Sequence, residues 1–416
     1  MPWVFMAVAL VGLVFVLNAY VPPRLEAIAV PSFFAGWVTG ELPVQHIVWQ
    51  VGATVAFGLL GAFRSWPGWV GCGAAVVGWA GLAGLAVAGK HSATIIAAAE
   101  EPGEAVTGES RRGETPSPNS GSETMWHWPR LAFPLPVRPS EIEMTAGIDY
   151  AGDGMARHRL DVLHRRDMSL PGPVLIYVHG GAWIMGNKRQ QGLPMLYEMA
   201  RRGWVCVKIN YRLSPRATWP DHIVDCKRAV SWVRANVAAY GGDPRFVAIS
   251  GGSAGGQLCS LVALTSGDPL FQPGFEHDDA SVDACVALYG VYDMTGYAAT
   301  SYSRELVRLL EKIVFKSRLA DNPVLFERAS PVKRVTAGAP PFYVVHGAND
   351  TLVPVIEARR FVAQLRAVSG SSVTYVELPL AQHAFDVLPS MRCANVVAGV
   401  TRFLERTRQS CSSRSA

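Results

Sequence analysis

The feature that most constrains the fold is a glycine-rich turn between an apolar run and an Ala/Leu-rich segment. Residues 246–264 read FVAISGGSAGGQLCSLVAL, and the turn matches the pattern G-x-S-x-G. A strand, a sharp turn and a helix in this order need small residues at the turn, because larger side chains would clash with both elements. The turn presents the Ser253 hydroxyl at a sheet edge and leaves the Ala254 amide at a helix N-terminus. We expect a nucleophilic serine here; the alternative is a glycine-rich loop with an incidental serine.

Alternating strand-like and helix-like segments after residue 141 indicate one α/β domain. Two segments, 142–148 and 157–163, are typical of an antiparallel pair. Apolar runs rich in Val, Ile, Leu, Ala and Phe then recur between helix-length stretches, at 174–178, 205–209, 246–249, 284–288, 342–345 and 373–378. Such runs are typical of a parallel sheet that helices cover on both faces. The expected fold class is α/β, with about eight strands in a mostly parallel sheet flanked by helices.

The first hundred residues have the composition of a membrane region. Their charged side chains are Arg24, Glu26, Glu41, Arg64, Lys90 and Glu100. The segments 1–23, 42–63 and 67–89 predict about three transmembrane helices within a membrane region over 1–90. A cleaved signal peptide is the alternative for the first segment, but it has no positive n-region. The segment 27–38 is short and contains a proline, so we expect it to be interfacial or re-entrant.

The membrane region is expected to be separate from the catalytic domain. A flexible linker is predicted over 91–138, because 100–123 is rich in Glu, Gly, Ser, Thr and Pro and cannot bury a core. The catalytic domain is then expected over 139–410. Few contacts should cross such a linker, so the membrane region should anchor the enzyme without completing its site. The positive-inside rule gives a near tie, so it does not predict which side of the membrane the catalytic domain faces.

The net charge and the cysteine pattern limit the kinds of partner and cofactor that we expect this chain to bind. A formal net charge of +5 over 416 residues, with no basic run containing interleaved aromatics, does not indicate a nucleic-acid partner. The seven cysteines include no C-x-x-C pair, and neither a metal nor a cofactor is implied. Cys206, Cys226, Cys259 and Cys285 lie in apolar segments and are expected to be buried free thiols.

Other motifs supply the groups that a serine nucleophile needs. The residues His179-Gly180-Gly181-Ala182-Trp183 directly follow the strand 174–178, and glycines there let backbone amides point at an oxyanion. Asp350 follows the penultimate strand and His383 the last one, in the chain order serine, acid, histidine. Asp293, at the end of the strand after the serine, is the rival acid. A helical pattern over 303–316 predicts either a surface helix or a cap over the acyl pocket.

Five blocks in this order resemble the hormone-sensitive-lipase group of α/β-hydrolase carboxylesterases, and within it a membrane-anchored bacterial branch. They are HGGAW (179–183), NYRLSP (210–215), YGGDPRFVAISGGSAGG (240–256), HGANDTLVP (346–354) and QHAF (382–385). Two departures from the group are Gly252, where many members carry Asp, and Ala182, where many carry Gly.

The resemblance implies an α/β-hydrolase fold and a membrane-anchored serine esterase or lipase that acts on small-molecule or lipid esters. It implies a triad of Ser253, Asp350 and His383. The oxyanion donors it implies are the amides of Gly180, Gly181 and Ala254, which the Ala182 amide can join. The alternatives are an amidase or formamidase or a prenylcysteine methylesterase on the same triad, and a non-catalytic membrane adaptor.

Overall fold

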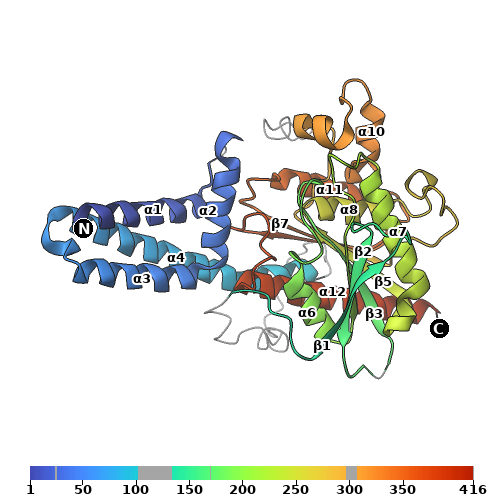
Figure 1. Cartoon of the computed structure of the whole chain (residues 1–416), viewed down its shortest axis with the longest axis horizontal. Coiled ribbons are helices and arrows are strands. Elements are labelled where there is room, and N and C mark those ends of the chain that lie inside the picture. The colour runs from blue at the N-terminus through green and yellow to red at the C-terminus, as the bar shows by residue number, and fades with distance from the viewer. Residues whose placement is uncertain (24–25, 102–133, 169, 297–306, 416) are drawn as a thin grey trace, which may run out of the picture.

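The computed structural model describes the chain except for residues 24–25, 102–133, 169, 297–306 and 416. An α/β domain carries a bundle of N-terminal helices that projects from one of its sides (Figure 1). Most of the predicted linker, including the stretch 126–133 with its two tryptophans and one phenylalanine, lies outside the described residues.

Within the described residues, eight strands form one sheet in the order β1-β2-β4-β3-β5-β6-β7-β8. The strands are β1 (Ile142–Asp149), β2 (Arg159–Arg165), β3 (Gly172–Val178), β4 (Val205–Ile209), β5 (Gly242–Gly252), β6 (Ala284–Leu288), β7 (Phe342–Gly347) and β8 (Val373–Leu378). β2 runs antiparallel to β1 and to β4, and the other neighbours are parallel. The predicted fold class, its strands and its antiparallel start are confirmed.

Helices cover both faces of the sheet, because side chains on each central strand alternate between two apolar cores. On β3, Val174 and Ile176 lie in the core formed with α7, α8 and α11. Tyr177, the next residue on the strand, lies in the opposite core, with α6 and α12. The helices are α6 (Leu193–Arg201), α7 (Asp221–Asn236), α8 (Ala254–Leu264), α10 (Pro323–Arg328), α11 (Val355–Val368) and α12 (Met391–Ser415).

Short helical segments connect these elements. They are η1 (Glu26–Ile28), η2 (Ala62–Arg64), η3 (Val237–Tyr240), η4 (Pro269–Phe271), η5 (Leu310–Phe315) and η6 (Pro331–Lys333). The cysteines predicted to be buried are buried free thiols.

The N-terminal bundle contains α1 (Pro2–Tyr20), α2 (Ala29–Glu41), α3 (Pro43–Leu59) and α4 (Trp66–Glu100). By length and composition, two of the described helices, α1 and α4, are able to cross a membrane. The third predicted span corresponds to α3, which has 17 residues. The segment expected to be interfacial forms the 13-residue helix α2, which lies across the base of the bundle next to the α/β domain (Figure 1).

The predicted start of the linker at residue 91 is wrong, because α4 continues without a break to Glu100. Its 35 residues make a helix of about 52 Å. The first part of α4 belongs to the bundle, and its last turns pack Ile95, Ile96 and Ala99 into the core that contains α12. An apolar face that packs on another helix keeps these residues helical.

Candidate active site

Ser253 occupies a strained turn between β5 and α8. Its backbone dihedrals are φ 59° and ψ −123°, which non-glycine residues rarely adopt and which cost about 1–3 kcal/mol. The two glycines of the motif are required by close approach. A Cβ at Gly251 would lie 2.4 Å from the Gly255 carbonyl oxygen, and one at Gly255 would lie 2.1 Å from the Val178 oxygen. The turn leaves Ser253 half-buried, while Ala254 begins the 11-residue helix α8.

Asp350 and His383 meet in the loops that follow the neighbouring strands β7 and β8. His383 Nδ1 lies 2.6 Å from Asp350 Oδ2, and both side chains are almost fully buried. Burial alone would raise the pKa of the Asp350 carboxyl, but attraction to His383 and hydrogen bonds from His346 and His383 outweigh it and lower that pKa. Asp350 is therefore ionised at neutral pH and can accept from the imidazole.

His346 gives Asp350 a second neighbour. Its Nε2 lies 2.9 Å from the Val353 carbonyl oxygen and 3.3 Å from Asp350 Oδ2. The amides of Leu352 and Val353 also donate to Asp350 Oδ1, each at 2.8 Å. These donors orient the Asp350 carboxylate toward His383. His346 therefore has a structural role, since it contacts Asp350 from the end of β7.

Tyr289 connects His383 to the serine turn. Its ring centroid lies 4.5 Å from that of His383. Its hydroxyl lies 2.5 Å from the position of a Cβ on Gly252, the residue before Ser253. The same hydroxyl donates to Asp386, which is also buried. The sequence did not single out Tyr289, because only the folded sheet brings the end of β6 beside the loop after β8.

Asp293, the other candidate acid, is hydrogen-bonded to Thr295. Its Oδ1 accepts from the Thr295 amide at 2.9 Å and also from the Thr295 hydroxyl. Asp293 thus closes the turn after β6, whereas the acid in contact with His383 is Asp350.

The motif His179–Trp183, which is expected to supply oxyanion donors, lies against Ser253. One of its predicted donors already forms a hydrogen bond within the protein. A Cβ at Gly180 would lie 3.0 Å from the Ser253 Cβ, so the two motifs are in contact. The Gly180 amide donates to Gln191 Oε1 at 2.7 Å, so in this arrangement it is not available to an oxyanion. Within the described ranges, no acceptor is bonded to the amides of Gly181 and Ala182. Sequence reasoning missed Gln191 because it lies in a loop outside the motif.

The 303–316 segment is described only from residue 307. Its Val314 carbonyl accepts from the Trp219 amide at 2.9 Å, and Phe315 stacks on Phe326 with centroids 4.1 Å apart. Both Val314 and Phe315 belong to the core formed with α7, α8 and α11. The described part therefore packs on the α/β domain, against Trp219 and Phe326.

The expectation that few contacts join the N-terminal region to the catalytic domain is wrong. Phe33 on α2 lies edge-on to the His383 ring, with centroids 6.1 Å apart. Glu41, at the end of α2, forms a buried ion pair with Arg392 of α12. Glu100, at the end of α4, accepts from Arg402 at 2.8 Å. The linker composition could not indicate these contacts, because they come from helices that precede it.

A mostly parallel sheet with a serine turn after β5, an acid after β7 and a histidine after β8 defines an α/β-hydrolase. A BD-FAE family model matches residues 160–365. The probable carboxylic ester hydrolase LipM of Mycobacterium tuberculosis strain H37Rv is 43% identical over 412 residues, covering 96% of this chain and 92% of LipM. Esterase LipQ of the same organism is 48% identical over 263 residues, 62% of each chain.

Among solved structures, an inhibited esterase B from Lactobacillus rhamnosis has a TM-score of 0.57 at 19% identity, covering 69% of this chain and 94% of that chain. That likeness shows the fold alone. The chain belongs to the α/β-hydrolase family of carboxylic ester hydrolases and is an enzyme of this class. Because the match to LipM covers 96% of the chain, it extends into the N-terminal helices.

Proposed function

We propose that the protein is a membrane-anchored serine carboxylesterase or lipase with a triad of Ser253, His383 and Asp350. The observation that carries this proposal is the 2.6 Å contact of His383 Nδ1 with Asp350 Oδ2, beside the strained serine turn. A buried carboxylate bonded to Nδ1–H fixes the tautomer in which Nε2 is free to accept a proton. The strained backbone at Ser253 supports its role as nucleophile, because such strain gathers at functional sites.

The reaction proceeds through an acyl-enzyme. His383 Nε2 takes the proton of the Ser253 hydroxyl while the oxygen attacks the ester carbonyl, and a tetrahedral oxyanion forms. The amides of Gly181, Ala182 and Ala254 stabilise that oxyanion, the last of them at the N-terminus of α8. Histidine then gives the proton to the leaving alkoxide. Water, deprotonated by the same histidine, attacks the acyl-enzyme and releases the carboxylic acid with Ser253 restored.

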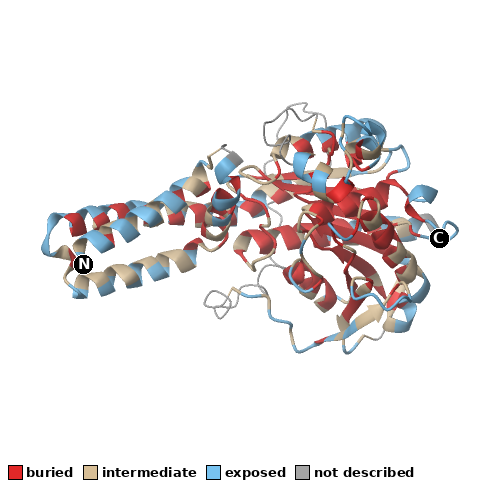
Figure 2. Cartoon of the chain, turned by 45° about the horizontal axis from the view of Figure 1, so that its top comes forward, coloured by how far each residue is buried: buried red, intermediate tan, exposed pale blue. Residues whose placement is uncertain are grey.

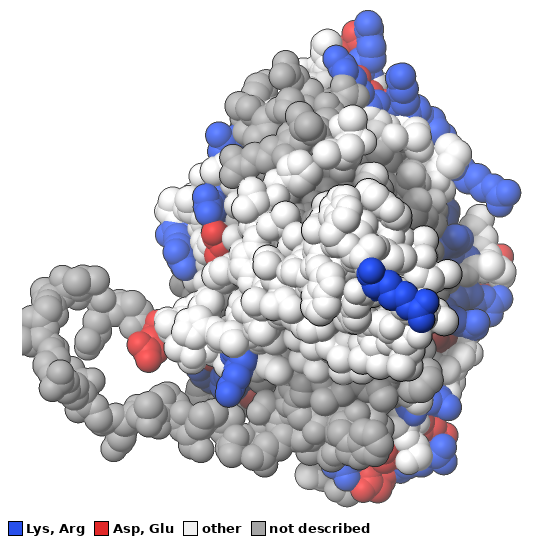
Figure 3. All heavy atoms as spheres, turned by 90° about the vertical axis from the view of Figure 1, so that its left-hand side faces the viewer, with Lys and Arg blue, Asp and Glu red and all other residues white. Residues whose placement is uncertain are grey.

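Membrane anchoring by the N-terminal bundle is the second part of the proposal. Large apolar side chains along α1 are exposed, including Val4, Val11 and Leu17. Viewed from the end of the bundle, the central surface is mostly uncharged, with basic colour near its centre and most of the charged side chains around the rim (Figure 3). An exposed apolar surface of this extent is costly in water and favourable in lipid. The α/β domain over 139–410 would then hydrolyse esters at the membrane surface.

An ester chain-length series measured on the full chain in detergent, with Ser253→Ala as control, tests the activity. We expect hydrolysis of at least the short soluble esters, and a loss on the order of 10³-fold or more in Ser253→Ala. Unchanged turnover in that variant would contradict the triad. An aryl formamide of matched size tests the amidase alternative, and faster turnover of the formamide than of every ester would replace the esterase assignment.

A further inference from the structure

Helix α2 lies directly against the loop that carries His383. On that face of α2, Phe33 is buried with its ring edge-on to His383, at 6.1 Å between centroids and an interplanar angle of 80°. One turn later, Trp37 Nε1 donates to the carbonyl oxygen of Ala384 at 2.9 Å. Phe33 and Trp37 also stack on each other, with centroids 5.6 Å apart. One helix face therefore contacts both His383 and the peptide that follows it.

A glycine brings α2 close to the residue before His383. A Cβ at Gly36 would lie 3.2 Å from Gln382 Cγ, and 3.0 Å from Asn18 Nδ2 on α1. Gln382 is buried, and its Oε1 accepts from the Thr351 amide at 3.1 Å. The side chain covered by α2 thus bridges the histidine loop and the acid loop.

The N-terminal helices also hold both neighbours of Asp350. Asn349 Nδ2 donates to the carbonyl oxygens of Ala19 and Tyr20, at 2.9 and 3.1 Å. Thr351 Oγ1 donates to the carbonyl oxygen of Ala29 at 3.2 Å. These carbonyls belong to the end of α1 and the start of α2, so the same segment fixes the acid loop from outside.

The histidine loop is one that needs such support. Leu380 and Ala384 have positive φ, 55° and 60°, although neither is glycine. Left-handed backbone at a residue with a Cβ costs on the order of 1 kcal/mol or more, and it persists only where surrounding contacts fix it. The Trp37 bond to Ala384 is one of those contacts.

We propose that α2 is a positioning element of the active site, in which Phe33, Gly36 and Trp37 hold the His383 loop in register with Asp350. The proposal rests on the triad proposed above. It assigns the N-terminal helices a role beyond anchoring, because the base and the acid are both positioned against them. A small displacement of the imidazole would reduce proton transfer without removing any group that touches the substrate.

Steady-state kinetics of the full chain on a short soluble ester test this role. Trp37→Phe keeps an aromatic ring but removes the hydrogen bond to Ala384, and Gly36→Val forces α2 away from Gln382. We expect both to lower kcat on the order of 10-fold or more, with KM near the wild-type value. Labelling of the serine by a fluorophosphonate should slow by a similar factor. Val30→Ala is the matched control, since Val30 also lies on α2 and is 55% exposed, and it should leave kcat unchanged.

The outcomes separate this proposal from the proposed function. Wild-type kcat in both Trp37→Phe and Gly36→Val overturns the positioning role, as does a rise in KM at unchanged kcat, which would make α2 a substrate-binding wall. Thermal unfolding of each variant detects a loss of folded enzyme. If Gly36→Val unfolds, Trp37→Phe and Phe33→Leu decide the question. Full activity of Ser253→Ala would instead reject the triad itself.

Discussion

At the scale of single residues, the limited space beside Ser253 explains why this chain has glycine at position 252. Many members carry Asp at the position of Gly252, but here a Cβ would meet the Tyr289 hydroxyl at 2.5 Å. That hydroxyl donates to Asp386, so a buried carboxylate reaches the region from a different loop. In this chain the Tyr289 hydroxyl therefore occupies the space that a side chain at position 252 would need. Sequence spacing alone could not reveal this pairing.

The two candidate acids should differ sharply in their effect on turnover. Asp350→Asn should lower kcat on the order of 10³- to 10⁴-fold, because an amide at this position no longer selects the required imidazole tautomer. Asp293→Asn should lower kcat by less than about 10-fold, since Asp293 Oδ1 bonds to the Thr295 amide rather than to the histidine. Initial rates on a short soluble ester measure both. The reverse ranking would move the acid to the turn after β6.

At the scale of elements, the sheet was predictable and the ends of some helices were not. The 174–178 part of β3 and all of β6 are continuous apolar runs that can be buried only between two helical layers, so the sequence alone predicts them. The last turns of α4 gave no such signal, because their helical state depends on packing against α12. The triad candidates followed from their places after strands. The hydrogen bond from the Gly180 amide to Gln191 depends on a loop conformation that the spacing of residues in the sequence does not predict.

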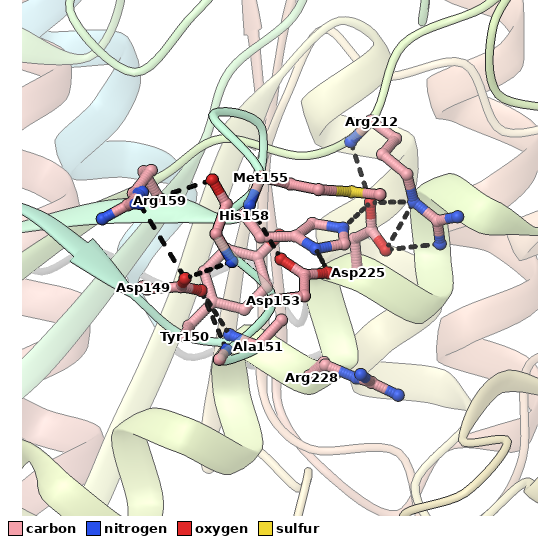
Figure 4. Close-up of polar contacts among 12 residues, drawn as sticks. Asp149, Tyr150, Ala151, Asp153, Met155, His158, Arg159, Arg212, Asp225 and Arg228 are labelled. Carbon is pink, nitrogen blue, oxygen red and sulfur yellow. Dashed lines mark hydrogen bonds and ion pairs between the residues drawn. The ribbon is translucent and has the colours of Figure 1, made fainter.

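A cluster of polar residues ties the hairpin at the sheet edge to α7 (Figure 4). His158, which directly precedes β2, has Nδ1 2.6 Å from Asp153 and Nε2 3.1 Å from Asp225 on α7. Arg212, in the NYRLSP block, pairs with Asp225 at 2.7 Å. Burial alone would lower the pKa of His158, but the hydrogen bonds and charges of Asp225 and Asp153 outweigh it and raise that pKa. The NYRLSP block thus has a structural function at this position.

The cluster predicts a pH-dependent stability. The folded-state pKa of His158 is raised, so protonated His158 adds to the free energy of unfolding. This added stability is fully present below the unfolded-state pKa of about 6.5 and is lost as pH rises through the folded-state pKa. Thermal unfolding of wild type and His158→Gln should therefore differ most at acidic pH, and the difference should shrink as pH increases. His277→Gln, at an exposed histidine, is the control. A difference that does not change with pH would contradict protonation of His158 in the cluster.

At the scale of the whole molecule, the bundle and the α/β domain share a buried interface. Buried residues continue from the domain into the base of the bundle, whereas the outer part of the bundle is largely exposed or half-buried (Figure 2). The interface contains the ion pair of Glu41 with Arg392, and Ser390 also donates to Glu41. Near the end of α4, the Tyr343 hydroxyl lies 3.2 Å from Glu100 Oε1. The bundle is therefore packed on the catalytic domain rather than tethered to it.

Removal of one partner of this buried pair should destabilise the folded chain. Arg392→Ala leaves the Glu41 carboxylate buried without its cation, and we expect a loss of about 3–5 kcal/mol in the free energy of unfolding. The double variant Glu41→Leu/Arg392→Met should recover most of that loss, since an apolar pair carries no desolvation cost. Chemical unfolding in detergent measures both. A loss below about 1 kcal/mol in Arg392→Ala would show that the interface does not depend on the pair.

Covalent labelling by a fluorophosphonate, mapped by mass spectrometry on the full chain, tests the central claim most directly. The reagent reacts with a serine only where a base activates the hydroxyl and amide donors hold the oxyanion. We predict a single adduct, on Ser253, which is absent in Ser253→Ala and forms more slowly in Asp350→Asn. An adduct on another residue, or labelling that persists in Ser253→Ala, would contradict the account.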